Sequence, residues 1–321
     1  METDELNVVT GAFGYTGKYI ARRLLALGKR VKTLTDRPIS HSVFGAQVSA
    51  ASFNFNDPPK LVESLRGASI LYNTYWVRFS YRSVTFQKAI DNSINLINAA
   101  KDAGISRIVH VSVTNPSQAS PLPYFKGKAV VEKAIFDSKL SYAIIRPALI
   151  FGPEDILINN IAYLLRRFPI FAIPGTGDYR LQPIFVEDMA HICVNAGSQR
   201  ENIMIDAVGP ETYTFRDLVH LIAQTVASKA TIMHLSPSFL LLLAKLLGYV
   251  LDDVILTADE VKGLMSNLLV SANPPMVQTK LSQWLKQNAD TLGTQYASEL
   301  KRHYRPGNVS PAQKTAIKTP N

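Results

Sequence analysis

Three glycines near the start of the chain constrain its fold more than any other feature. Residues 7–10 have the apolar composition of a buried strand, residues 18–27 read as a helix, and Gly11, Gly14 and Gly17 stand between them. The first glycine allows a sharp turn, the second leaves room for a phosphate near the backbone, and the third lets the helix approach the sheet. Because the helix start favours an anion, the spacing predicts a site for the diphosphate of a dinucleotide. A tight βα turn without a ligand is the alternative.

Two residues after the next predicted strand bear on the choice of dinucleotide. Residues 29–35 read as a strand, and Asp36 follows Gly17 by about 20 residues, where a Rossmann fold places the carboxylate that binds the adenosine ribose. Asp36 therefore favours NAD slightly. Arg37 beside it is suited to a 2′-phosphate, which leaves NADP open, and an ordinary strand-end turn is the alternative for both residues.

The first half of the chain alternates strands with helix-length segments. Further strands are predicted at residues 47–55, 69–74, 107–112 and 141–146, with an amphipathic helix at 84–103. This alternation predicts an α/β fold built on a Rossmann-type, doubly wound parallel sheet. In such a sheet the carboxyl ends of the strands face the ligand crevice.

Several residues at these strand ends are candidates for cofactor contacts. Asp57 follows the third strand, near the expected adenine, and is equally suited to cap the helix that comes next. A polar and aromatic run, 73–79, follows the fourth strand and is expected to line the crevice, with a packed loop as the alternative. The remaining candidates are Phe13, Tyr15 and Thr16 in the glycine loop, and Asn73, Thr74 and Tyr75 in the run.

A tyrosine and a lysine carry the predicted chemistry. Residues 121–123 (Pro-Leu-Pro) place a helix start near Tyr124, and Lys128 lies one turn later on the same face. A neighbouring ammonium and the positive helix start are expected to lower the pKa of Tyr124, which would make it an acid and base. Thr114, with Ser112 as second choice, is expected to hold the substrate oxygen. The alternative is a helix cap, a turn and a solvated lysine.

These motifs, with Arg146-Pro147 and residues 151–153 (Phe-Gly-Pro), resemble the short-chain dehydrogenase/reductase superfamily, in its extended and atypical branches. The sequences of residues 73–79, 123–128 and 151–155 resemble those of NAD-dependent epimerase/dehydratase-like proteins. These proteins are related to the nucleotide-binding accessory subunit of respiratory complex I. The likeness runs from about residue 6 to 304.

The resemblance implies roles for residues already singled out. The three glycines would hold the pyrophosphate, Tyr124 would be the acid and base with Lys128 beside it, and Pro147 would lie near the nicotinamide. Two departures stand out: Thr114 and Tyr124 are closer together than is typical of extended epimerases, and Asp36 stands where many atypical members carry a basic residue. Since the complex I subunit binds its nucleotide without established turnover, cofactor binding does not imply catalysis.

Beyond residue 152 the pattern becomes less regular. We expect residues 1–152 to form the dinucleotide-binding domain, with its sheet completed by the segments 182–186, 188–196 and 203–207. Residues 153–181 and 208–305 are expected to form a smaller, mostly helical lobe over the substrate. The basic tail, 306–321, is expected to be disordered.

The segment 238–251 is strongly apolar, with Lys245 as its one charge. It is shorter than the ~20 residues of a membrane-spanning helix, so a core or interface helix is expected. A helix resting on a membrane surface is the alternative.

Charge and cysteine content exclude several classes. The net charge of +9 comes largely from the end of the chain, and the other basic residues are scattered, which argues against nucleic-acid binding. Cys193 is the one cysteine, and no H-x-x-x-H pair occurs, so neither a disulfide nor a metal site is expected. The acidic N-terminus lacks an apolar signal core, which predicts a cytoplasmic protein, at most peripheral to a membrane.

Two functions follow. The first is an NAD(P)-dependent enzyme that transfers a hydride to or from a small-molecule substrate, with Tyr124 and Lys128 assisting. The second is a non-catalytic dinucleotide-binding protein of a respiratory or membrane complex, supported by the apolar segment and the basic tail. A nucleic-acid-linked regulator ranks third, and neither the substrate nor the oligomeric state follows from the sequence.

Overall fold

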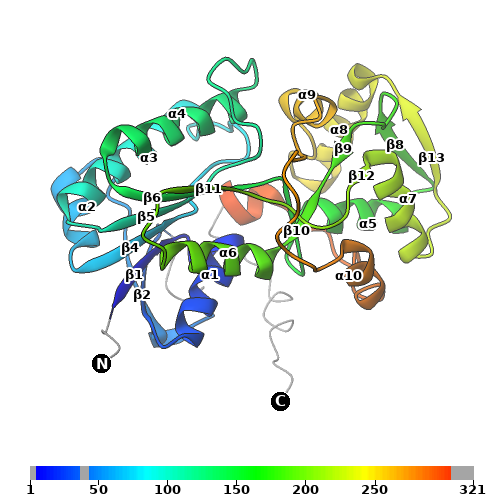
Figure 1. Cartoon of the computed structure of the whole chain (residues 1–321). Coiled ribbons are helices and arrows are strands. Elements are labelled where there is room, and N and C mark those ends of the chain that lie inside the picture. The colour runs from blue at the N-terminus through cyan, green and yellow to red at the C-terminus, as the bar shows by residue number, and fades with distance from the viewer. Residues whose placement is uncertain (1–4, 37–42, 305–321) are drawn as a thin grey trace.

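The computed structural model describes residues 5–36 and 43–304, and Arg37 and the tail at 306–321 lie outside these ranges. Its centre is a seven-stranded parallel sheet in the order β11-β6-β5-β4-β1-β2-β3 (Figure 1). The strands are β1 (Leu6–Thr10), β2 (Arg30–Leu34), β3 (Val48–Ala51), β4 (Ala68–Asn73), β5 (Arg107–Val111), β6 (Ser141–Pro147) and β11 (Ile203–Ala207). This is the predicted Rossmann-type order, and the chain changes direction across the sheet between β1 and β4.

Helices cover both faces of the sheet, as a doubly wound fold requires. Helices α2 (Pro58–Leu65), α3 (Phe86–Asp102) and α4 (Pro123–Ser138) pack on one face, around a core that includes Leu61, Leu96 and Ile135. Helices α1 (Tyr15–Ala26) and α6 (Val186–Gly197) pack together on the other (Figure 1). The carboxyl ends of the strands therefore form an edge between two rigid helical layers.

A second body of structure has its own core, beside this carboxyl edge (Figure 1). Its helices are α5 (Leu157–Arg167), α7 (Phe215–Thr225), α8 (Pro237–Leu251), α9 (Ala258–Met265), α10 (Leu281–Gln287) and the short η3 (Leu300–Tyr304). Its strands pair in twos: β7 (Leu149–Phe151) with β10 (Pro183–Phe185), β9 (Arg180–Leu181) with β12 (Tyr213–Thr214), and β8 (Ile170–Pro174) with β13 (Thr231–Leu235). A short η2 (Gly45–Gln47) precedes β3 in the first body. We call the second body, with its six helices and three strand pairs given above, the C-terminal lobe.

The return to the sheet differs from the expectation. Only β11 joins the seven-stranded sheet, whereas β10 pairs with β7 outside it. The segment 188–196, expected to return to the sheet, lies in helix α6, because its buried residues Met189, Cys193 and Ala196 recur at helical spacing and pack against α1.

The apolar segment 238–251 lies in helix α8, as expected, but α8 is not a core helix. Only Leu240 and Gly248 of its residues are buried. The apolar side chains on its outer face are Phe239, Leu242, Leu243, Leu246, Tyr249 and Val250, the last of which is 79% exposed. Among the described residues, no helix combines the length and apolar character needed to cross a membrane.

Candidate functional site

The glycine loop has the geometry that its spacing predicts. Gly11 turns the chain off β1 with φ of +68°. A Cβ on Gly17 would lie 2.4 Å from the carbonyl oxygen of Gly11, so only glycine lets the first turn of α1 pack so closely on the loop. Gly14 is the N-cap of α1, supplies no capping side chain, and is followed by a first turn without an acidic residue. The start of α1 thus presents N–H groups and positive dipole toward the crevice.

Tyr15, one of two aromatic residues in the glycine loop, packs against the segment that follows β7. Its hydroxyl lies 2.9 Å from the position that a Cβ on Gly152 would take, and it is buried without a hydrogen-bond partner among the described residues. Burial, and then the nearby Asp155 carboxylate, raise the pKa of Tyr15 well above its usual value. Phe13 and Thr16 are half-buried in the same loop. Tyr15 is therefore a neutral side chain packed between the glycine loop and the segment after β7.

Buried polar groups fix the loop after β4. The hydroxyl of Thr10 accepts hydrogen bonds from the backbone N–H groups of Thr74 (2.7 Å) and Tyr75 (3.1 Å), and Thr74 Oγ1 donates to Thr10 O (2.6 Å). Asn73 is fully buried, and its Nδ2 lies 3.1 Å from His110 Nδ1. Asn73, predicted to contact a cofactor, is therefore enclosed in the network that positions the loop, because its amide is used by protein groups.

The expected adenine side of the crevice contains a cluster of aromatic rings. The rings of Phe53, Phe55 and Tyr75 contact one another at centroid distances of 4.7–5.2 Å. Asp36 is exposed and its Oδ1 accepts a hydrogen bond from Phe53 N at 3.2 Å. Asp57 caps α2 through Lys60 N at 3.3 Å, which is the capping role considered for it.

Tyr124 and Lys128 share one face of α4, as predicted, and Trp76 joins them. The indole ring of Trp76 packs edge-on against Tyr124, with ring centroids 6.1 Å apart, and Lys128 Nζ lies 4.6 Å from its centroid. A Cβ on Gly127 would lie 2.9 Å from Trp76, so the small residue between them seats the indole. Lys128 Nζ also donates to Val111 O at 2.7 Å. From the sequence, the run 73–79, which includes Trp76, is expected to line the crevice, but the contacts of Trp76 with Tyr124 and Lys128 are not predicted.

The pKa values of this pair differ from the expectation. Burial raises the pKa of Tyr124 to about 12 and, with Glu132 opposing, lowers the pKa of Lys128 to about 7. The prediction that Lys128 and the helix start lower the pKa of Tyr124 is wrong for this structure, because aromatic rings desolvate the phenol and the amine is turned toward Val111. Tyr124 thus retains its proton at neutral pH, as an ordinary tyrosine does, and is a weaker acid than one.

Both hydroxyl candidates at the end of β5 are engaged by other groups. Ser112 Oγ donates to Glu132 Oε1 at 2.6 Å, and the same carboxylate pairs with Arg146 at 2.6 Å. Thr114 Oγ1 donates to Leu268 O at 2.7 Å, and its N–H donates to Pro147 O at 2.9 Å. Glu132, one turn after Lys128, was not singled out from the sequence, although its spacing places it on the same face.

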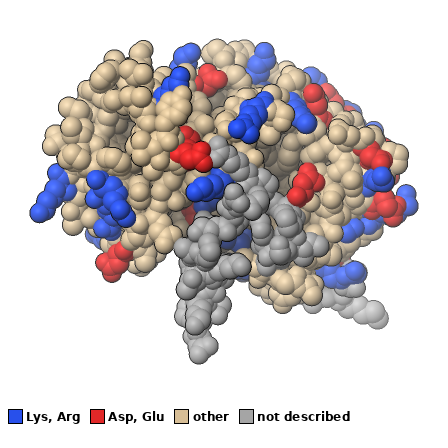
Figure 2. All heavy atoms as spheres, turned by 180° about the vertical axis from the view of Figure 1, so that it is seen from behind, with Lys and Arg blue, Asp and Glu red and all other residues tan. Residues whose placement is uncertain are grey.

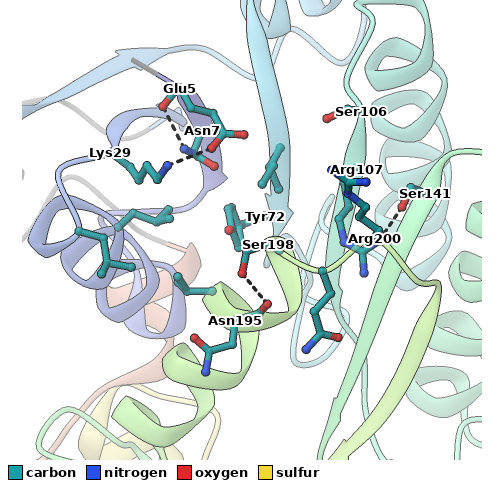
Figure 3. Close-up of a pocket in the computed structure, with 16 residues that line it drawn as sticks. Glu5, Asn7, Lys29, Tyr72, Ser106, Arg107, Ser141, Asn195, Ser198 and Arg200 are labelled. Carbon is teal, nitrogen blue, oxygen red and sulfur yellow. Dashed lines mark hydrogen bonds and ion pairs between the residues drawn. The ribbon is translucent and has the colours of Figure 1, made fainter. Parts of the chain in front are cut away.

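A cavity of about 540 Å³ lies at the opposite, amino edge of the sheet (Figure 3). Its buried cation, Arg107, donates to Ala196 O (2.9 Å), Glu201 O (2.8 Å) and Ser141 Oγ (2.5 Å). This guanidinium satisfies one carbonyl group at the end of α6 and another in the turn that follows the helix, which is a stabilising role. We assign the cavity no part in the predicted crevice.

The sequence of the chain is similar to those of several known proteins. A sequence profile of the NmrA-like family matches residues 3–291. The chain is 24% identical over 285 residues to the mitochondrial NADH dehydrogenase (ubiquinone) 1 alpha subcomplex subunit 9 of Arabidopsis thaliana, covering 83% of this chain and 71% of that protein. The mouse protein of the same name is 27% identical over 228 residues, covering 67% and 59%. The chain thus spans 59–71% of the length of these two relatives.

One bacterial relative and two solved structures are also similar to the chain. A ceramide reductase of Caulobacter vibrioides is 26% identical over 193 residues, covering 59% of this chain and 61% of that protein. The NADPH complex of the Escherichia coli NADPH-dependent quinone oxidoreductase QOR2 superposes with a TM-score of 0.71 at 21% identity, covering 88% of this chain and 99% of that one. Citrobacter triphenylmethane reductase with NADP(H) superposes at 0.64 and 19% identity, with the same coverage of both chains. The two solved structures establish the Rossmann-type fold.

Proposed function

Because the chain belongs to the NmrA-like family, we propose that it binds a nicotinamide dinucleotide and acts as an NAD(P)-dependent oxidoreductase. The observation that carries the proposal is the glycine loop, where a Cβ on Gly14 would lie 3.1 Å from Gly11 O at the uncapped start of α1. A backbone kept bare at a helix start is suited to a diphosphate. The reductase and quinone oxidoreductase named above, which have the same fold, support this choice.

The residues that would hold the dinucleotide follow from their places along the carboxyl edge. Gly11, Gly14 and the N–H groups of Tyr15 and Thr16 would face the diphosphate, and Asp36 would face the adenosine ribose. Thr74 and Tyr75, whose backbone N–H groups are held by Thr10, would lie beneath the central part of the dinucleotide. Pro147 would lie near the nicotinamide. Asp36 supports NAD slightly, while the NADPH and NADP(H) complexes of the neighbours support NADP.

Tyr124 would supply the proton in this chemistry. A bound nicotinamide supplies or accepts the hydride. The Tyr124 phenol is protonated at neutral pH and would donate its proton to a carbonyl oxygen that is being reduced, although its pKa of about 12 makes it a weaker acid than an ordinary tyrosine. Lys128, which lies on the same helix face, would hold the nicotinamide ribose after leaving Val111 O. Thr114 and Ser112 would contact substrate only after exchanging their present partners, so we give them lower rank.

The test combines the bound nucleotide with one substitution. Mass spectrometry of the nucleotide released from the purified protein should find NAD or NADP, and the 2′-phosphate decides between them. Tyr124→Phe should abolish NAD(P)H oxidation with a panel of carbonyl compounds while changing dinucleotide affinity by no more than about threefold. Tyr249→Phe, on the exposed face of α8, is the matched control. Turnover that survives Tyr124→Phe would refute the catalytic assignment.

A non-catalytic accessory protein of a membrane complex is the second candidate. The exposed apolar face of α8 favours it, since contiguous exposed apolar surface marks interaction sites. The NADH dehydrogenase relatives support the same idea. This function would place the protein at a membrane complex rather than free in the cytoplasm. This function predicts that the protein is retained in a membrane-complex fraction, that Leu246→Lys abolishes this retention, and that the protein shows no turnover. A protein that is not retained and is active would exclude it.

A further inference from the structure

The last described segment, residues 296–304, joins the two bodies of the protein across the carboxyl edge. We call it the strap. One end is anchored in the C-terminal lobe by the carboxylate of Asp253, which is 8% exposed. This carboxylate accepts hydrogen bonds from Tyr296 Oη (2.8 Å), Glu299 N (2.9 Å) and Leu300 N (3.0 Å). The anchor involves only the lobe and the strap itself.

The other end of the strap contacts the loop after β4. Tyr304 stacks on Phe79 with ring centroids 5.1 Å apart and an angle of 9°. Its hydroxyl donates to Phe79 O at 2.6 Å and accepts from Phe79 N at 3.3 Å. Arg78 in this loop bonds to Glu299 at 3.2 Å and to Glu260 of α9 at 2.5 Å. These contacts close the loop after β4 against the C-terminal lobe.

A third contact reaches the segment after β7. Arg302 Nη1 donates to Glu154 O at 2.5 Å, and the Glu154 carboxylate pairs with Lys18 in the second turn of α1. The strap therefore spans from the end of β4 to the end of β7. The nicotinamide half of a dinucleotide bound at the glycine loop would lie over β4, β5 and β6, beneath this span.

We propose that the strap gates the dinucleotide crevice: the nicotinamide half enters and leaves only while residues 300–304 are detached from the loops after β4 and β7. The anchor at Asp253 lets the strap swing away without leaving the lobe. The contacts that break are the stack of Tyr304 on Phe79, the edge-on contact of Tyr304 with Tyr81 (ring centroids 5.5 Å apart) and a few part-buried polar bonds. The modest strength of such contacts allows opening in solution. The adenosine half binds over β2 and β3 and does not need this opening. The proposal rests on the proposed function.

Stopped-flow kinetics of NADPH and NADH, followed by their fluorescence, test the gate. Tyr304→Ala removes the stack and both backbone bonds, and Tyr304→Phe removes only the bonds. We expect association and release to be accelerated together, at least about fivefold in Tyr304→Ala and less in Tyr304→Phe, with Kd changed by less than about threefold. Tyr249→Ala is the matched control, and thermal unfolding checks that each variant is folded.

ADP, which has only the adenosine diphosphate part, separates the outcomes. Because ADP lacks the fluorescent nicotinamide, its association and release are followed with fluorescently labelled ADP, and both rates should be the same in all variants. Equal dinucleotide rates in the wild type and the Tyr304 variants, or ADP rates that change as much as those of NADPH, would overturn the gate and leave the proposed function standing. If neither dinucleotide nor ADP binds the folded wild type or the folded variants, both proposals fail.

Discussion

Lys128→Met should change how the stability of the protein depends on pH. Lys128 is 2% exposed, and burial lowers its pKa to about 7, against about 10.4 for a lysine in an unfolded chain. Between these two pH values the unfolded chain binds one proton more than the folded protein. The free energy of unfolding must therefore rise with pH in this window. The cost of burying the ammonium is complete below pH ~7 and fades toward pH ~10.

The magnitude follows from the two pKa values. One pKa unit corresponds to about 1.4 kcal/mol, so the Lys128 contribution should rise by about 2–3 kcal/mol between pH ~6 and pH ~9. Lys128→Met keeps most of the side-chain volume and removes this slope. It also leaves Val111 O without its donor, which costs about 1 kcal/mol at every pH. Glu132 and His110, which act electrostatically on this amine, are present in both proteins, so their effects largely cancel.

Urea unfolding of the wild type and Lys128→Met at four pH values from about 6 to 9 measures this difference. Lys133→Met is the control, because Lys133 lies on the same helix with an exposed side chain paired to Asp137 at 2.6 Å. The wild type should gain stability relative to Lys128→Met as pH rises, and Lys133→Met should run parallel to the wild type. Parallel profiles for all three proteins would refute the desolvated state of Lys128.

Three further substitutions test the packing around the site. Gly17→Ala should lower the free energy of unfolding by about 3 kcal/mol, because its Cβ would meet Gly11 O at 2.4 Å; an unchanged urea midpoint would contradict the close approach. Glu132→Gln should cost about 2 kcal/mol, since it leaves the partly buried Arg146 guanidinium without its carboxylate, whereas the exposed Glu63→Gln should cost nothing measurable in the same assay. Asp253→Asn should increase hydrogen exchange within residues 296–304 while β1 stays protected, and equal exchange in both proteins would remove Asp253 as the anchor.

Local patterns in the sequence were enough to predict the first body of the fold. Strand–helix alternation and the glycine spacing identified β1 to β6, α1 and the order of the sheet. The cap at Asp57 also follows from local spacing and is present. The segment 188–196 was misread because a short apolar run fits a buried strand and a buried helix equally.

The environment of the candidate site could not be predicted in the same way. Spacing places Tyr124 and Lys128 on one helix face, but the ring that covers them, Trp76, comes from the loop after β4. Thr114 is engaged by Leu268, a residue far along the chain in the C-terminal lobe. Burial and long-range contacts of this kind determine the pKa values of the site residues and decide which hydroxyl groups are free to bind a substrate. A local sequence pattern shows neither burial nor long-range contacts.

Calorimetric titration of NADPH and NADH into the wild type and Gly14→Ala tests the central claim most directly. The φ of Gly14, −93°, is open to alanine, but a Cβ there would lie 3.1 Å from Gly11 O, so we expect Gly14→Ala to fold with somewhat lower stability. Its methyl group would also stand at the bare backbone that we propose faces the diphosphate. The account predicts binding by the wild type and at least about tenfold weaker binding by Gly14→Ala, a loss of about 1.4 kcal/mol, at a temperature where thermal unfolding shows both proteins to be folded. Equal affinity in the two proteins, or no binding by the folded wild type, would contradict it.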